Sequence, residues 1–295
     1  MTKIKYIHCL GTSFTAGGGF EFDGNHTQEL RRSLYKNVNE ELTQYNFSYP
    51  GQLQKLVGTD KIVLNHAKQG YGNSRLIRKS FDIINEFDFN TDENLFIFEF
   101  AGLGRDEFFF KDLNSYIVCN YETIYKNENE IEFKYLGSAK SYNYDTFEEI
   151  QTTEKYDDFF QTYVTHFLNF KDQSSKIMRE TEMFLSYLES KNINFLFSLP
   201  PMIKNDYDAS REIEFGDGKY FKKSTNFVQF MDFNNLSITN ETSNKYADGH
   251  CGIKANKITA DCIYNKLVDC GYIDSQKNII DWEWYHKKDF LMNLI

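Results

Sequence analysis

The chain alternates between short apolar runs and longer segments in which hydrophobic residues recur at helical spacing. Four runs rich in β-branched and aromatic residues cover residues 3–10, 61–67, 94–101 and 192–199. Runs of this length without a three- or four-residue period are typical of strands that are buried on both faces. The pattern therefore predicts four buried strands.

Helices are predicted between and after these strands. Residues 50–57 begin with Pro50, residues 74–86 begin at the cap-like pair Asn73 and Ser74, and a stretch with helical character runs from about 157 to 190. A last helix is expected over residues 254–269, where apolar side chains recur at steps of three and four. Strands alternating with helices predict an α/β sandwich, with a mostly parallel sheet covered on both faces.

Three segments depart from this rhythm. Residues 110–155 mix aromatic and polar side chains, with alternation near residues 130–135, and predict an inserted β-hairpin. Residues 204–245 are polar and irregular, which indicates a surface excursion, expected near the mouth of the candidate site described below. The aromatic tail 281–295 is expected to dock on its own domain, and a partner-binding tail is the alternative. Residues 1–295 as a whole are expected to form a single domain.

Composition and charge narrow the classes of partner. Hydrophobic residues make up 41% and charged residues 26%, which is typical of a globular chain. The formal net charge of -10 repels phosphate backbones and anionic membrane surfaces. We therefore expect no nucleic-acid or membrane partner. The short basic clusters near residues 31–32, 75–79 and 222–223 are each expected to be a solvated face.

The cysteines and the N-terminus indicate where the protein acts. Five cysteines without a Cys-x-x-Cys pair predict neither a disulfide framework nor a zinc knuckle. The first residues are too polar for a signal-peptide core, and no run of about 18 apolar residues occurs. The expected location is cytoplasmic, or virion-associated and released by lysis.

The first candidate for chemistry is Ser13. The segment 11–17, Gly-Thr-Ser-Phe-Thr-Ala-Gly, directly follows the first predicted strand. Loops at the carboxyl ends of parallel strands are where α/β proteins build their sites, so a serine there meets substrate. A Gly-x-Ser turn is often only a turn, and a phosphate-binding glycine loop would need a Gly-Lys-Ser/Thr continuation that is absent. Ser13 is therefore a candidate nucleophile.

The second candidate is the pair Asp248 and His250, just before the last predicted helix. A nucleophilic serine needs a base within hydrogen-bond reach, and the base needs an acceptor that fixes its tautomer. Residues two apart in an extended loop place their side chains on the same side. The alternative is that Asp248 caps the helix beside a surface histidine.

His8, Cys9 and His66 come near the ends of neighbouring predicted strands and are residue types that bind metals. Cys9 is better explained as a small core residue, and no third ligand has the spacing of a metal site. The acidic pairs at 148–149 and 157–158 are best explained as solvated faces. No metal is expected.

Together, the Ser13 segment and the late Asp-Gly-His segment resemble the opening and closing blocks of the SGNH/GDSL hydrolases. The segment 65–73 is similar to the second block of that family, and residues 49–56 are similar to its first long helix. The resemblance implies a three-layer α/β/α fold in which Ser13 attacks an ester, while His250 and Asp248 complete the triad. It also implies that Gly70 donates a backbone N–H to the oxyanion and that no cofactor is required.

The chain departs from the family pattern at three places. Thr12 replaces the usual Asp before the serine, and Asp248 and His250 are two residues apart rather than three. In the third block, Arg105 stands where the oxyanion-binding Asn is expected. Arg105 or Asn73 is therefore the candidate side-chain donor to the oxyanion. The alternative is that Arg105 pairs with a nearby carboxylate, at position 99, 106 or 107.

The resemblance implies a serine esterase that hydrolyses small acyl esters, preferably acetyl esters such as those of O-acetylated carbohydrate. An acyltransferase using the same acyl-enzyme is the first alternative. A non-catalytic binding or structural protein, such as a virion component on the same fold, is the second.

Overall fold

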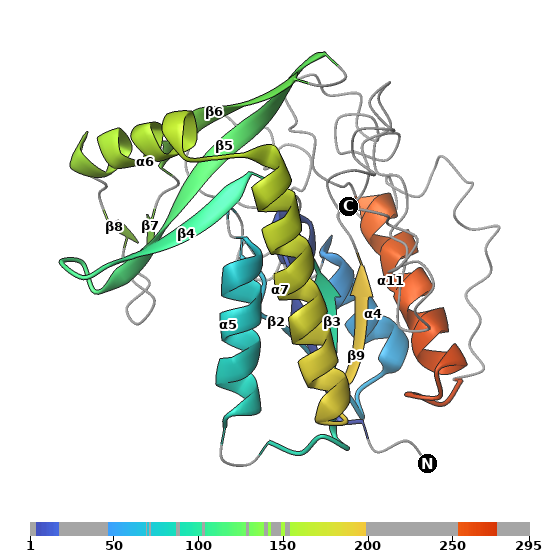
Figure 1. Ribbon diagram of the computed structural model, residues 1–295. Coiled ribbons are helices and arrows are strands. Elements are labelled where there is room, and N and C mark those ends of the chain that lie inside the picture. Colours follow the sequence, from blue (N-terminus) through green and yellow to red (C-terminus); the bar gives the residue numbers. More distant parts are fainter. Residues whose placement is uncertain are drawn as a thin grey trace.

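A computed structural model describes residues 4–17, 47–68, 70, 72–86, 89–101, 104–127, 130–138, 141–142, 149–150, 154–198 and 253–275. Its centre is a four-stranded sheet in the order β2-β1-β3-β9 (Figure 1). The strands are β1 (Tyr6–Leu10), β2 (Ile62–Asn65), β3 (Asn94–Glu99) and β9 (Asn194–Ser198). Every pairing among them is parallel, and the four predicted strands are confirmed.

Helices cover both faces of this sheet (Figure 1). One face is covered by α4 (Tyr49–Val57) and α11 (Ile253–Asp269). The other is covered by α5 (Asn73–Ile84) and α7 (Phe170–Ser190). The predicted α/β architecture is therefore confirmed as three layers.

The stretch predicted as helical from about residue 157 to 190 is divided into two helices. The first, α6 (Glu154–His166), ends before a short break, and α7 begins at Phe170. The side chain of Asn169 accepts a hydrogen bond from the Asp172 N–H at 3.2 Å. This N-cap satisfies one of the unpaired amides at the start of α7 and so fixes where the new helix begins.

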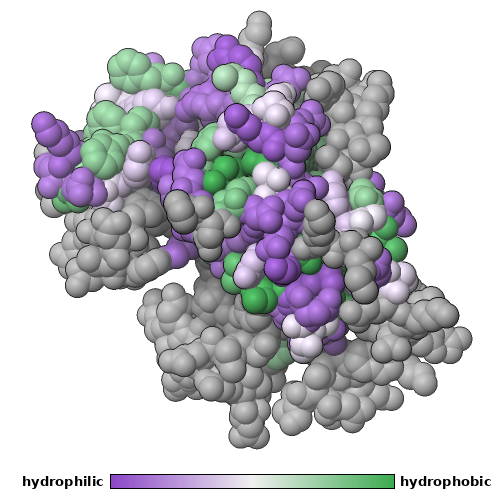
Figure 2. Space-filling model, turned by 90° about the horizontal axis from the view of Figure 1, so that it is seen from below, coloured by the Kyte–Doolittle hydropathy of each residue, from purple (hydrophilic) through white to green (hydrophobic). Residues whose placement is uncertain are grey.

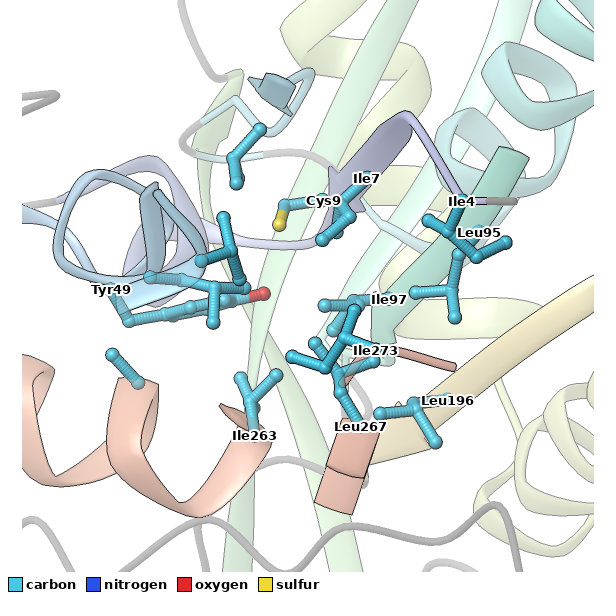
Figure 3. Packing of buried hydrophobic residues seen from close by; sticks show 14 of the residues in the cluster. Ile4, Ile7, Cys9, Tyr49, Leu95, Ile97, Leu196, Ile263, Leu267 and Ile273 are labelled. Carbon is cyan, nitrogen blue, oxygen red and sulfur yellow. The ribbon is translucent and has the colours of Figure 1, made fainter. Parts of the chain in front are cut away.

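Alternate residues of β3 enter two separate hydrophobic cores. Leu95 and Ile97 pack under α4 and α11, where Figure 3 shows them beside Leu196, Ile263 and Leu267. The intervening residues of the strand, Phe96 and Phe98, pack under α5 and α7. All four β3 side chains are essentially buried, which stabilises the fold by about 1.5–3 kcal/mol for each.

A three-stranded antiparallel sheet stands beside the sandwich. It consists of β4 (Arg105–Phe110), β5 (Ser115–Asn127) and β6 (Glu130–Ser138), in that order. Helix α6 packs on it through Tyr156, Phe160 and Val164, and two short strands, β7 (Ser141–Tyr142) and β8 (Glu149–Ile150), pair nearby. The predicted hairpin is thus an insert of more than two strands, and its first strand begins at Arg105 rather than after residue 110.

Buried polar groups attach this insert to the helices. Asp106 accepts hydrogen bonds from the hydroxyls of Tyr121 at 3.2 Å and Tyr163 at 2.9 Å. It also forms an ion pair with Lys176 of α7 at 3.1 Å. An acidic residue at this buried position is therefore compensated by partners from three different elements.

The basic cluster at residues 75–79 is not simply a solvated face, which corrects that prediction. Arg75 is buried and donates from Nη1 to the His66 carbonyl at 3.0 Å. Arg78 forms an ion pair with Glu107 at 2.9 Å and lies 3.8 Å from the centre of the Tyr116 ring. Both guanidinium groups connect α5 to neighbouring elements, because a planar fork can bond and stack at the same time.

Several predicted features lie outside the described residues: the excursion 204–245, the tail 281–295, and Cys251. Within the described residues, Cys9, Cys119, Cys262 and Cys270 are free thiols, and no helix there is long and apolar enough to cross a bilayer.

Seen from below, hydrophobic residues gather near the centre and at the left, the side of the insert (Figure 2). Exposed aromatic side chains on this side include Phe109 of β4 and Phe159 of α6, and exposed apolar side chains are ordinary on protein surfaces.

Candidate active site

Ser13 lies where the chain leaves the central strand β1. Two residues after β1 the chain enters the short helix α1 (Ser13–Ala16), whose first hydrogen bond runs from the Ala16 N–H to the Thr12 carbonyl at 2.9 Å. Gly17, with φ of 81°, ends what we call the serine turn, residues 11–17. The chain continues from β1 to its neighbour β2 at one edge of the sheet and from β3 to its neighbour β9 at the other edge. The serine turn therefore lies at the topological switch point between β1 and β3. Open parallel sheets bind their ligands there.

A carboxylate from the neighbouring strand binds the serine turn. Glu99, the last residue of β3, is completely buried. Its Oε1 accepts a hydrogen bond from the Thr12 hydroxyl at 2.6 Å, and its Oε2 accepts bonds from the Thr15 N–H at 2.9 Å and from the Thr15 hydroxyl. Burial raises the pKa of the Glu99 carboxyl, and the bonds from Thr12 and Thr15 oppose that rise. The residues on both sides of Ser13 are thereby fixed to β3.

Gly11 has no room for a side chain. A Cβ atom at this position would lie 2.8 Å from both the Cβ and the Oε2 of Glu99, and would also press on the Thr15 hydroxyl. The absence of a side chain at Gly11 therefore allows the carboxylate of Glu99 to lie directly against the serine turn.

The end of β2 is bonded to the same turn. Asn65 ends β2 and donates from Nδ2 to the Thr15 carbonyl at 3.0 Å, while its Oδ1 accepts from the Ala67 N–H at 3.1 Å. Gly70, the predicted backbone donor to the oxyanion, follows in this loop with φ of 77°. Only glycine adopts that left-handed conformation without cost, so the residue type fits the loop.

Asn73 is used in a way that the sequence did not indicate. Its Oδ1 accepts a hydrogen bond from the Ala101 N–H at 2.6 Å, and its Nδ2 donates to the Ala101 carbonyl at 3.0 Å. The side chain thus pairs with a backbone residue as a strand neighbour would, and it joins the start of α5 to the segment that follows β3. Within the described part of the chain, the second N–H of this amide has no acceptor and could serve another group.

Arg105 begins β4 and packs closely against the loop before α5. A Cβ at Gly72 would lie 3.1 Å from the Arg105 carbonyl oxygen and 3.3 Å from its Cβ. Of the three carboxylates considered as partners, Asp106 and Glu107 form ion pairs with other residues, whereas Glu99 attracts Arg105. Burial lowers the pKa of the Arg105 guanidinium and the charge of Glu99 opposes that change. A cation therefore accompanies the carboxylate that binds the serine turn.

The predicted acid and base, Asp248 and His250, lie outside the described residues. Helix α11 begins shortly after them, and its residue Asn256 accepts a hydrogen bond from the Tyr49 N–H at 2.8 Å. The hydroxyl of Tyr49 lies 3.3 Å from Oγ1 of Thr15. A single residue of α4 therefore contacts both α11, through its backbone, and the serine turn, through its side chain.

His8 and His66, for which the sequence predicts no metal site, are hydrogen-bonded to each other. Asn94 donates from Nδ2 to the Asn90 carbonyl at 2.8 Å, so its Oδ1 accepts from Nε2 of His8 at 2.7 Å. His66 then donates from Nε2 to Nδ1 of His8 at 3.0 Å. Desolvation, together with the neighbouring His8, lowers the pKa of His66 to about 3, and desolvation lowers that of His8 as well. Cys9 packs in the core of the opposite face, and no group of three metal-ligating side chains occurs among the described residues.

The sequence predicts that Ser13, Gly70, Asn73 and Arg105 lie in loops that converge on one end of the sheet. Ser13 and Gly70 follow β1 and β2, whereas Asn73 is the first residue of α5 and Arg105 is the first residue of β4. The sequence does not predict that Glu99 binds the serine turn. It indicates Glu99 only as one possible partner of Arg105. The available signal was an acidic residue at the end of an otherwise apolar strand, since such a residue needs a buried partner.

Comparisons with known proteins find distant likenesses in fold only. No known protein-family profile matches the chain, and no curated protein sequence matches it. Five solved chains are similar to this one, and two of them are described here. One is a putative lipolytic protein of the G-D-S-L family from Desulfitobacterium hafniense DCB-2, with a TM-score of 0.45 and 11% identity, covering 89% of this chain and 99% of the other. The other is a family two carbohydrate esterase from Clostridium thermocellum, solved with cellohexaose, with a TM-score of 0.42 and 12% identity, covering 91% of this chain and 65% of the other. The activities in those descriptions belong to those proteins.

Proposed function

We propose that this chain is a serine esterase of the SGNH/GDSL type, with Ser13 as nucleophile, His250 as base and Asp248 as the residue that orients the base. The observation that carries the proposal is the position of Ser13. It lies just after the carboxyl end of β1, in a turn bonded to both β3 and the last residue of β2. A serine in this position supports the proposal, because open parallel sheets bind their ligands at the carboxyl ends of their strands.

The reaction would proceed through an acyl-enzyme. His250 takes the proton of Ser13 as the hydroxyl attacks the ester carbonyl, and the backbone N–H groups of Ser13 and Gly70 hold the oxyanion. Collapse of the tetrahedral intermediate expels the alcohol with a proton from His250. Water then attacks the acyl-enzyme by the same route and releases the acid.

A side-chain donor is proposed to assist the two backbone amides. Arg105 interacts with Glu99 under the serine turn and carries a permanent charge. Asn73 bonds Ala101 with only one of its two amide N–H groups among the described residues. Because Asn73 already holds the backbone, Arg105 is the better candidate for the donor.

The substrate is proposed as a small acyl ester, preferably an acetyl ester on a carbohydrate. This choice rests on the resemblance of the Ser13, Gly70 and His250 segments to the family blocks. No cofactor is needed for the chemistry, because a base-activated hydroxyl and fixed N–H donors suffice for acyl transfer.

A non-catalytic binding protein on the same fold is the second candidate. It is favoured by Arg105 at the place of the family's third-block asparagine and by the commitment of Asn73 to Ala101. Such a protein would retain an ordered edge of the sheet without turnover.

The two candidates are separated by kinetics with an activated acetyl ester. We expect Ser13→Ala and His250→Ala each to lower turnover by about 10⁴-fold or more, with the double variant little worse than either. Full activity in Ser13→Ala would end the esterase proposal. Absence of turnover in the wild type on a panel of acyl esters would favour the binding protein.

A further inference from the structure

The most unusual group near the site is the carboxylate of Glu99. It is completely buried, and among the described residues it accepts hydrogen bonds from Thr12 and Thr15. A buried carboxylate is costly unless it is compensated, and an apolar residue would be the cheaper choice for stability alone. The hydrogen-bonding capacity of Glu99 is therefore directed at the serine turn.

The contacts restrain that turn on both sides of Ser13. Thr12 precedes Ser13 directly, and Thr15 follows it by two positions in the short helix α1. One carboxylate oxygen binds each of these residues, and the carboxylate is attached to β3, which is paired along its length with β1 and β9. The Gly11 backbone lies against Glu99 as well, since a Cβ there would come within 2.8 Å of it.

We infer that Glu99 is a positioning residue that fixes the orientation of the Ser13 hydroxyl and of the Ser13 N–H. It does not touch the substrate; it acts through Thr12 and Thr15. The inference rests on the proposed role of Ser13 as nucleophile. Reactivity depends steeply on placement, because a displacement of about 1 Å at a catalytic group can cost about 100-fold in rate.

The sharpest test removes one bond and leaves the carboxylate in place. Thr12→Val keeps the shape of the side chain but loses the hydroxyl that donates to Oε1 of Glu99. Thr12→Ser keeps the hydroxyl and loses only a methyl group. Ser198→Ala is the matched control, because Ser198 is a buried hydroxyl residue at the end of β9, in register with Glu99.

We would measure kcat and KM on an activated acetyl ester, the rate of covalent labelling by a fluorophosphonate probe, and the melting temperature. Thr12→Val should lower kcat and the labelling rate by about 10-fold or more with KM changed less than twofold, since placement of the nucleophile is lost rather than substrate binding. Thr12→Ser should restore both values, and Ser198→Ala should leave them unchanged. A role in stability alone would lower the melting temperature without this split between kcat and KM.

Wild-type kcat and labelling in Thr12→Val would overturn the inference, as would a failure of Thr12→Ser to restore them, because shape rather than the hydroxyl would then be responsible. Glu99→Gln gives a second, independent reading, since it keeps the size of the side chain and removes its charge; unchanged kcat and labelling there would also count against the inference. If the wild type itself is not labelled at Ser13, the proposed function fails, and the inference fails with it. If the wild type is labelled and the variants match it, only the inference fails.

Discussion

Replacing Asn73 with alanine should destabilise the protein more than an ordinary change at a helix start. The substitution leaves the N–H and the carbonyl of Ala101 without the partners that now lie at 2.6 and 3.0 Å. A buried backbone group that loses its partner costs about 1–3 kcal/mol, so the two groups together cost about 2–6 kcal/mol. That is a large part of the total stability of a typical domain, which is about 5–15 kcal/mol.

The measurement is the melting temperature of Asn73→Ala, followed by kcat corrected for the folded fraction. In proteins of about this size each kcal/mol moves the melting temperature by about 2–4 °C, so we expect a fall of at least about 4 °C. Asn194→Ala is the matched control, because the Asn194 side chain also donates to a backbone carbonyl, that of Thr91, at 2.8 Å, but near the amino end of β9.

The outcome distinguishes two roles of the amide. If Asn73 only holds the backbone, kcat per folded molecule should fall little. If its remaining N–H also serves the oxyanion, kcat should fall by about 10²–10³-fold. A melting temperature equal to that of the wild type would refute the reasoning, because Ala101 would then have found other partners at no cost.

Three further predictions concern the rest of the described fold. Gly11→Ala should lower the free energy of unfolding by about 1–3 kcal/mol and slow labelling of Ser13, because its Cβ cannot fit against Glu99. Acidification should destabilise the protein below pH 6.5, because His66 is held neutral in the folded state and is protonated first in the unfolded state; the loss should reach about 2 kcal/mol by pH 5 and be weaker in His66→Gln. Asp106→Asn should lower the free energy of unfolding by about 1.5–3 kcal/mol, because it weakens a charge-assisted bond to Lys176.

Each of these has its own control and contrary result. Calorimetry on Gly11→Ala that shows a wild-type melting temperature would mean that Glu99 moves aside freely. For the histidine, the exposed His166 supplies the control variant His166→Gln, and a wild-type stability curve that is flat from pH 7 to 5 would contradict the sign worked out above. For Asp106, the exposed Glu182 of α7 supplies Glu182→Gln, and equal melting temperatures in the two variants would contradict a special role for Asp106.

The parallel sheet could be predicted because its strands are buried on both faces and so appear as continuous apolar runs. The first strand of the insert could not be predicted in the same way. Asp106 and Glu107 look like surface charges, and their partners Lys176 and Arg78 are distant in the sequence. A pattern of neighbouring residues does not reveal such pairs. The predicted insert therefore begins at residue 110, whereas the observed one begins at Arg105.

The same limit applies to the site. Ser13 and Gly70 could be placed because each follows a recognisable strand, and strand ends converge at one edge. The hydrogen bonds that Glu99 accepts from the serine turn could not be predicted, because they depend on the register of β1 against β3. The two hydrogen bonds between Asn73 and Ala101 could not be predicted either. They are a long-range contact, made by a residue that the sequence indicates only as a helix start.

The central claim is that Ser13 is an activated nucleophile, and covalent labelling tests it most directly. The wild-type protein would be incubated with a fluorophosphonate probe, and the site of modification located by peptide mass spectrometry, with Ser13→Ala and the His250→Ala variant beside it. The account predicts stoichiometric modification at Ser13, none in Ser13→Ala, and greatly slowed labelling in His250→Ala, because the hydroxyl needs its base to attack phosphorus. An unmodified wild-type protein, or modification at another residue that persists in Ser13→Ala, would contradict it.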